Sequence, residues 1–188
     1  MPTEQDQDYL GRLDDLLAEI GPTGTPARIF DGVDDDFWLW IHTTGRSLSP
    51  ALHGLWPELP DPELQRHWVG KSGTEALNEG FEIYRTFRGL HQKHVGPVRA
   101  NGPILDFGCG FGRVLRFFAK DVNEGDLLGS DADAELVGVC QQNDRWSTVT
   151  RNNEWPPTGF ADGQVGVIYA FSVFSHFSED VHRAWLEE

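Results

Sequence analysis

The sequence predicts an α/β protein, a three-layer sandwich with a parallel sheet, preceded by an N-terminal helical extension. After residue 103, short apolar runs alternate with helical runs, which is the pattern of a parallel sheet covered on both faces. Before that point, proline, glycine and tryptophan are frequent in residues 21–70, and one long helical pattern covers residues 73–94. We therefore expect an extension or cap over residues 1–98 and a sheet domain over residues 99–188.

The extension begins with a short amphipathic helix. Leucine and isoleucine recur at helical spacing over residues 8–20, and Gly21-Pro22 ends the pattern. Residues 21–70 should be folded but irregular, because they hold too many large aromatic rings for a free linker. The tryptophans of this segment are Trp38, Trp40, Trp56 and Trp68. They either pack the extension onto the sheet domain or, in part, line a substrate pocket.

The long helix over residues 73–94 has a predicted start signal and two candidate functional residues. Ser72 and Glu75 have the spacing of a capping box, in which both side chains satisfy free backbone N–H groups. Tyr84 and Arg88 lie one turn apart on one face. They could close over a bound ligand, or they could be a packed ring and a solvated charge.

The sheet domain should contain four strands and three helices. Apolar strands are expected over residues 103–109, 126–131, 147–150 and 165–174, and helices over residues 112–122, 134–143 and 179–188, the last capped by Ser178. In such sheets, ligands bind beyond the carboxyl ends of the strands. A glycine-rich stretch lies at one of these ends.

This stretch, "ILDFGCGFGR" over residues 104–113, indicates a cradle for a nucleoside cofactor. Gly108, Gly110 and Gly112 allow the backbone to bend and to approach a ligand closely. The third glycine comes one residue earlier than in the dinucleotide motif G-x-G-x-x-G. Asp106 would repel a pyrophosphate, whereas it suits the sulfonium and ammonium groups of S-adenosylmethionine.

A second acid supports a nucleoside without identifying it. Asp131 follows Gly112 by nineteen residues and ends the second expected strand. An acid there can accept hydrogen bonds from both ribose hydroxyls, a device that dinucleotide and methyl-donor sites share.

With these motifs in place, residues 103–188 resemble a class I S-adenosylmethionine-dependent methyltransferase of the methyltransferase-domain family, which has a Rossmann-like fold. The resemblance rests on "ILDFGCGFGR", "LLGSDADAEL" and "GFADGQVGVIYAFSVFSHFSEDVHRAWLEE". It implies S-adenosylmethionine as cofactor and methyl transfer as reaction. The donor-binding residues that it implies are Asp106, Gly108, Cys109, Gly110 and Gly112 for the methionine part, Asp131 for the ribose, Ala132 and Asn152 or Asn153 for the adenine, and Phe171 and Ser172 beside the donor.

Catalytic side chains are fewer. His176 follows the fourth strand and could act as general base if the acceptor must lose a proton, or it could brace the next helix. Cys109 fits a small packed residue between two glycines better than a nucleophile. His91 and His94 are spaced i, i+3 without an evident third ligand, so no metal is expected.

The net charge and the two cysteines narrow the classes of binding partner and the cellular location that we expect. A net charge of −15 disfavours nucleic acid and anionic membranes, so the expected acceptor is a small molecule. The two cysteines, Cys109 and Cys140, lack metal-binding spacing, and no run is long enough to span a membrane. A cytoplasmic protein is the default expectation. The rival functions are an NAD-dependent oxidoreductase and a non-catalytic remnant that binds the donor.

The resemblance stops inside the last helix, where the family usually continues with a fifth strand and an antiparallel pair. We therefore expect an incomplete domain whose fourth strand forms a bare, apolar edge. Such an edge predicts self-association and little activity. The family also often has Phe-Asp where this chain has Val165-Gly166, which should alter only local packing.

Overall fold

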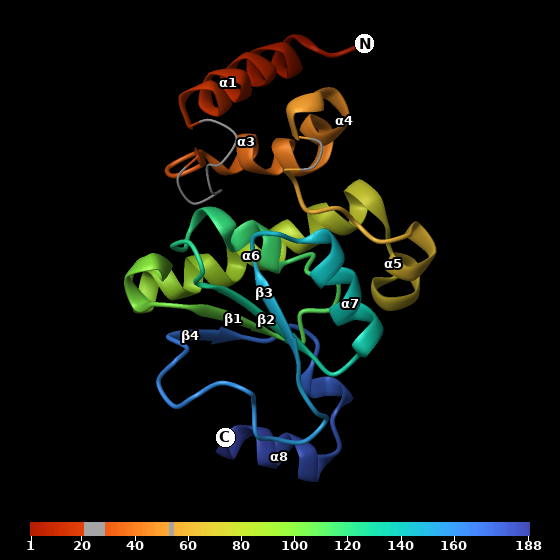
Figure 1. Cartoon of the computed structure of the whole chain (residues 1–188), viewed down its shortest axis with the longest axis vertical. Helices are drawn as coiled ribbons and strands as arrows, with labels where there is room; N and C mark the ends of the chain where they lie inside the picture. Colours follow the sequence, from red (N-terminus) through yellow and green to blue (C-terminus); the bar gives the residue numbers. More distant parts are fainter. Residues whose placement is uncertain (21–28, 53–54) are drawn as a thin grey trace.

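The computed structural model describes residues 1–20, 29–52 and 55–188, and it has four parallel strands with helices around them (Figure 1). The strands are β1 (Ile104–Phe107), β2 (Leu127–Asp131), β3 (Thr148–Arg151) and β4 (Val167–Tyr169), in the order β3-β2-β1-β4. Each neighbouring pair is parallel. The expected α/β class is confirmed.

The strand order places a switch point at the middle of the sheet. The chain runs outward from β1 to β3 and then returns to place β4 on the other side of β1. The strands β2 and β3 thus lie on one side of β1 and β4 lies on the other, and the carboxyl ends of the strands at such a switch point are the usual ligand site of these sheets. All four residues of β1 are buried, as a central strand requires.

Helices of the extension stand on one side of the sheet, and the last helix lies on the other (Figure 1). The extension contains α1 (Glu4–Ile20), α3 (Asp35–Trp40), the π-helical turn η1 (Ile41–Gly45), α4 (Arg46–Leu48), η2 (Pro50–Leu52), α5 (Pro62–Val69), α6 (Gly73–His94) and η3 (Val98–Asn101). The sheet domain contains η4 (Leu115–Lys120), α7 (Ala134–Asn143), η5 (Phe174–His176) and α8 (Glu179–Glu187). No helix in the described ranges is long and apolar enough to cross a membrane.

Residues from both sides of residue 98 share a single hydrophobic core. Trp38 is fully buried, and its indole N–H donates a hydrogen bond to the carbonyl of Phe117 at 3.0 Å. Trp40 and Trp56 are also buried. Trp38 and Trp56, which contacts Trp146, therefore pack the extension onto the sheet domain as expected, whereas Trp40 packs against Tyr9 and Phe37 within the extension. The division of the chain at residue 98 stays a prediction.

The helix expected over residues 112–122 is wrong in type and length. Only Leu115–Lys120 are helical, as the 3-10 segment η4. Its carbonyls are used by side chains from elsewhere: that of Phe117 accepts from Trp38, and that of Lys120 accepts from Arg99 at 2.7 Å. Both carbonyls lie in the last four residues of η4, where helix carbonyls have no intrahelical partner and side chains can satisfy them.

Two local predictions are also corrected. Ser72 occupies the cap position of α6 but makes no capping hydrogen bond; the N–H of Gly73 donates instead to Oε1 of the buried Gln65 at 2.9 Å. The fourth strand spans three residues rather than the ten of 165–174, since only Val167–Tyr169 pair with β1, and the backbone has a positive φ of 60° at Ser172. Among the described strands β4 pairs only with β1, so it forms an edge, as expected.

Candidate functional site

A cavity of about 990 Å³ opens beyond the carboxyl ends of the strands. Its volume is at the upper end of the range of ligand pockets, roughly 300–1,000 Å³. The sequence-predicted residues that line it are Asp106, Gly108, Cys109, Gly110, Asp131, Ala132, Asn152, Asn153, Phe171, Ser172 and His176. Gly112 is the one predicted site residue that does not line it.

The loop after β1 needs glycine at its first position. Gly108 has a φ of 77°, and a Cβ there would lie 2.2 Å from Cγ2 of Val173. The backbone N–H groups of Gly108 and Cys109 donate to the carbonyl of Ser130 at 2.8 and 3.0 Å. The loop is thus pressed between β2 and the segment after β4, which positions its backbone at the cavity.

Asp131 holds the same loop in place from the end of β2. Its Oδ2 accepts from the N–H of Gly110 at 2.8 Å, and its Oδ1 accepts from the N–H of Asp133 at 2.9 Å. A carboxylate has about four acceptor positions, so two remain for hydroxyl groups of a ligand. Asp133 in turn caps α7 through the N–H groups of its first turn.

Asp106 is a buried acid at the floor of the cavity. Its residue is 3% exposed, and burial raises its pKa to about 7, with a smaller contribution from the negative charge of Asp131. The Tyr169 hydroxyl and the charge of Arg113 oppose this shift. Within the described residues, that hydroxyl reaches no partner at hydrogen-bond geometry. A cation entering the cavity would therefore favour the charged form of Asp106.

An orphaned acceptor lies where the third strand ends. Asn152 Oδ1 is buried and has no hydrogen-bond partner among the described residues, while its Nδ2 donates to the carbonyl of Asn153 at 2.7 Å. A buried acceptor without a donor costs free energy, and a ligand amino group would remove that cost. Of the two asparagines left open by the sequence, the geometry therefore favours Asn152.

The two cysteines have a packing role. Both are buried, and the pKa of Cys109 is raised well above its ordinary value by the Cys140 thiol and by burial. Both thiols point to the carbonyl of Gly110, from 3.7 and 3.3 Å. A neutral thiol is a poor nucleophile, so this geometry supports packing under the loop. Gly112 lies here too, since a Cβ on it would be 3.5 Å from the Cys140 sulfur.

The segment after β4 forms another wall. Phe171 is exposed, and Ser172 is the non-glycine residue with positive φ in the described ranges, a strained conformation that is frequent at functional sites. His176, in η5, is exposed and lines the same cavity.

The cavity lining also includes Arg113, Glu79 and Trp68, which the sequence did not single out as donor-binding. Arg113 donates to Oε2 of Glu79 on α6 at 2.5 Å, and this bond holds the pKa of Glu79 below its ordinary value. Within the described lining, Arg113 is the sole lysine or arginine. Trp68, on α5, also lines the cavity and is 46% exposed. Arg113 stands inside the quoted motif, but only the fold brings Glu79 and Trp68 to it.

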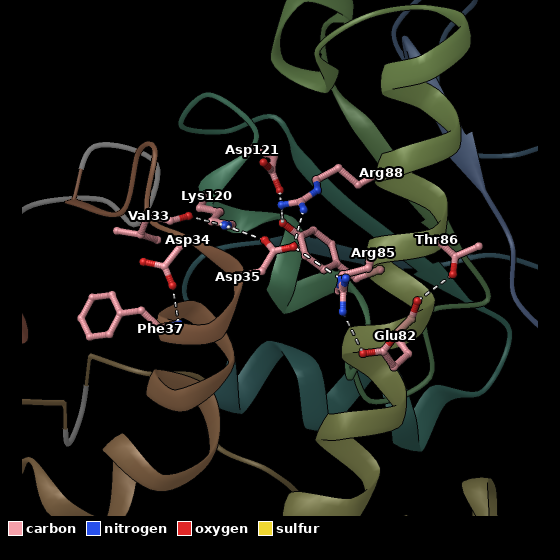
Figure 2. Close-up of polar contacts among 11 residues, drawn as sticks. Val33, Asp34, Asp35, Phe37, Glu82, Arg85, Thr86, Arg88, Lys120 and Asp121 are labelled. Carbon is pink, nitrogen blue, oxygen red and sulfur yellow. Dashed lines mark hydrogen bonds and ion pairs between the residues drawn. The ribbon is translucent and has the colours of Figure 1, made fainter. Parts of the chain in front are cut away.

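Tyr84 and Arg88 do not close over the cavity. The Tyr84 hydroxyl donates to Asp121, and Arg88 donates to that hydroxyl and to Asp35. Figure 2 shows Arg88 and Lys120 converging on Asp35 at the junction between α3, α6 and η4. Neither residue lines the cavity, so of the two alternatives the structure favours the packed ring, with the charge of Arg88 paired to Asp35 rather than solvated.

No group of three potential metal ligands occurs in the part of the chain that the structure describes. His91 instead places Nδ1 2.8 Å from the carbonyl of Gly96, at the end of α6.

Comparison with known proteins points to one family. Residues 104–188 match the family model described as "Methyltransferase domain". Two curated relatives are named ribosomal protein L11 methyltransferase. That of Cupriavidus metallidurans is 30% identical over 125 residues, 63% of this chain and 39% of the relative. That of Cupriavidus pinatubonensis is 28% identical over 131 residues, 66% of this chain and 42% of the relative. The chain thus spans about two fifths of the length of these relatives.

Solved structures show the same fold. The plantazolicin methyltransferase BpumL in complex with SAH has a TM-score of 0.50 at 17% identity, over 96% of this chain and 56% of that one. The same enzyme with a monoazolic desmethylPZN analog and SAH gives a TM-score of 0.50 at 16% identity, over 96% and 57%. These likenesses support the Rossmann-like fold.

Proposed function

We propose that the protein is a class I, S-adenosylmethionine-dependent methyltransferase that uses residues 104–188, which match the methyltransferase-domain family, to methylate a small-molecule acceptor. The observation that carries the proposal is the cavity floor. A buried acid, Asp106, stands beside a glycine loop that brings bare backbone to the ligand. A pyrophosphate would meet this acid with like charge, whereas a sulfonium and an ammonium would meet it with opposite charge.

Each polar part of the donor has a proposed binding partner among the residues of the cavity. Asp131 has acceptor positions free for the two ribose hydroxyls, as in other nucleoside sites. Asn152 Oδ1 offers its unused acceptor to the adenine amino group, and the backbone of Ala132 lies along the same wall. Phe171 and Ser172 border the donor at the end of β4.

Arg113 is proposed to bind the donor carboxylate. It is the cationic side chain of the described lining, and its guanidinium has donors left after the bond to Glu79. A guanidinium matches a carboxylate in charge and in planar geometry. Arg88, the other arginine that the sequence singled out, lies at the junction outside the cavity.

In methyl transfer the protein itself need not form a covalent bond with either reactant. When bound, S-adenosylmethionine supplies a methyl group on a positively charged sulfur and leaves as a neutral thioether. The chain contributes by fixing the two reactants in line, which can account for much of such a rate enhancement. His176 is proposed to accept a proton from the acceptor where one must be lost, because it lines the cavity beyond β4 and is open to solvent.

The test is calorimetry on the full chain with S-adenosylhomocysteine and, separately, with NAD. We expect binding of the first and no response to the second, because the acid at the floor disfavours a pyrophosphate. Tight NAD binding without a response to S-adenosylhomocysteine would assign the protein to the oxidoreductases instead. Turnover with a candidate acceptor then separates an enzyme from a protein that binds the donor only.

A further inference from the structure

Trp68 differs from the other tryptophans of the extension in exposure and position. Trp38, Trp40 and Trp56 are at most 8% exposed and pack in the core. Trp68 is 46% exposed and lines the cavity, although a large apolar ring gains free energy from burial. From this ring and its surroundings we infer that Trp68 recognises the methyl acceptor by stacking, and that the acceptor is a flat aromatic compound without negative charge. The inference rests on the proposed methyltransferase function.

The helix that carries Trp68 is firmly held. Asp61 caps α5 by accepting from the N–H of Glu63 at 2.7 Å, and Gly70 ends it with a φ of 73°. The side chain of Gln65 is buried, with the residue 2% exposed, and it bonds to the backbone on both sides of α5. Its Nε2 donates to the carbonyl of Pro60, before the helix, and its Oε1 accepts from the N–H of Gly73, after the helix. The structure therefore presents Trp68 on a fixed element, which a recognition residue needs.

The other side of the cavity supplies apolar and aromatic partners. Four apolar residues line it from the C-terminal part of the chain: Phe171 and Val173 between β4 and η5, Phe177 after η5, and Val181 in α8. Trp68 reaches it from the extension, and Figure 1 shows α5 and α8 on different sides of the sheet. Aromatic rings from two directions favour a planar ligand, because ring faces stack on ring faces.

The cavity has room and charge for such a ligand beside the donor. Its volume of about 990 Å³ lies at the top of the range for a single small ligand. Five acids line it, and Arg113 is the single lysine or arginine of the described lining. The acids are Glu79, Asp106, Asp131, Asp133 and Glu154. This excess of negative charge repels anionic acceptors and accepts neutral or cationic ones.

The donor does not account for the exposed ring. Its charged and polar groups are matched by the strand ends and the glycine loop, whereas Trp68 belongs to α5. If Trp68 contacts the acceptor alone, its removal should leave donor affinity unchanged. Donor and acceptor binding can therefore be separated in one protein.

The experiment uses the full chain saturated with S-adenosylhomocysteine and three probes: 2-naphthol, its saturated analogue decahydro-2-naphthol, and 2-naphthoate. Binding is followed by calorimetry for the unaltered protein, Trp68→Leu and Trp68→Phe. We expect 2-naphthol to bind most tightly and to lose about tenfold in affinity in Trp68→Leu, since stacking and ring area together are worth about 1.4 kcal/mol. Trp68→Phe should retain most of the affinity.

The matched control is Trp155→Leu. Trp155 is 51% exposed, like Trp68, but does not line the cavity. It should leave the binding of 2-naphthol and of S-adenosylhomocysteine unchanged. The saturated analogue should bind more weakly than 2-naphthol and be nearly insensitive to Trp68→Leu, and 2-naphthoate should bind weakest.

Each contrary outcome overturns a stated part of the inference. Failure of 2-naphthol to bind the loaded protein excludes the aromatic class. Equal binding of decahydro-2-naphthol shows that the cavity selects apolar volume rather than ring faces. A loss of S-adenosylhomocysteine affinity in Trp68→Leu as large as that of 2-naphthol makes Trp68 a donor residue. If S-adenosylhomocysteine does not bind the unaltered protein, the proposed function itself fails and the inference falls with it.

Discussion

The junction between the extension and the sheet is closed, whereas the opposite edge of the sheet is open. At the junction Trp38 is fully buried, and Arg116 is 2% exposed, with its guanidinium bonded to the carbonyls of Gly112, Pro57 and Glu58. At the other edge Ile168, in β4, is 64% exposed. The candidate site lies between these two regions. The glycine loop on its donor side packs near the closed junction, and the segment after β4, at the open edge, forms its outer wall.

This difference assigns separate tasks to the two regions. Buried hydrogen bonds and aromatic packing at the junction determine whether the glycine loop is in place. The exposed segment from β4 to α8 contributes apolar surface to the cavity but few buried contacts. Substitutions at the junction should therefore affect stability first, and substitutions at the edge should affect association and acceptor binding.

The largest effect is expected from Trp38→Ala. The substitution removes a fully buried ring and leaves the Phe117 carbonyl without its donor. Truncation of a buried aromatic side chain to alanine costs about 3–5 kcal/mol of unfolding free energy. Urea unfolding measures it. The exposed Trp155→Ala should cost about 0.5 kcal/mol or less. Equal losses in the two variants would show that the junction is not the closed region.

The next effect is on the donor side. Asp131→Ala should weaken S-adenosylhomocysteine binding by about 2–4 kcal/mol, since hydrogen bonds to a charged group are worth roughly 1.5–3 kcal/mol each and do not add fully. The variant also loses the bond from the N–H of Gly110. Asp131→Asn, which keeps an acceptor, should be milder. Calorimetry measures the S-adenosylhomocysteine affinity of both variants. An unchanged affinity in Asp131→Ala would show that this residue does not bind the donor.

A pH dependence should follow from Asp106. Because burial raises its pKa to about 7, the carboxyl is neutral below that pH and charged above it. The charged form attracts the cationic donor, so S-adenosylmethionine affinity should increase as pH rises through 7 and level off above it. The decrease on the acidic side should approach about tenfold per pH unit.

The control for this pH dependence is Asp106→Asn, in which the group cannot ionise. Its affinity should be low and nearly flat between pH 5.5 and 8.5. A pH profile that keeps its slope in this variant would have to come from another group, and Asp106 would not be the acid that meets the donor.

The smallest effect on stability is expected at the open edge. Ile168→Lys places a charge on an exposed edge strand, where natural proteins use charges to block pairing with other chains. We expect a stability change of about 0.5 kcal/mol or less and reduced self-association in light scattering. If the unaltered chain is monomeric at high concentration, the edge does not recruit a second copy.

The sequence predicted what short-range chemistry determines. The loop around Gly108 and the acid Asp131 were found because strand, turn and helix follow one another closely along the chain. The Arg113–Glu79 pair was missed because its partners are 34 positions apart and meet only when α6 packs on the loop. Exposure of Trp68 was equally hidden, since nothing in its local sequence separates it from the buried tryptophans.

Two of the errors, at η4 and at Ser72, involve backbone groups whose hydrogen-bond partners come from distant residues. The segment of η4 has the apolar content of a helix, but side chains from the extension use its carbonyls. Ser72 has the right spacing for a capping box, yet Gln65 reaches the first N–H of α6 instead. Propensity and spacing describe what a segment can do alone, and they cannot include a distant donor or acceptor.

The carbonyls of η4 also bear on how such proteins can exchange parts by recombination. A crossover near residue 98 would unite this extension with a foreign sheet domain, whose regular helix would satisfy its own carbonyls. The indole of Trp38 would then lose the acceptor that it has here. We therefore expect a viable chimera to keep η4 together with the extension. The segment that is exchanged as one piece would end after Lys120, which lies inside the predicted sheet domain.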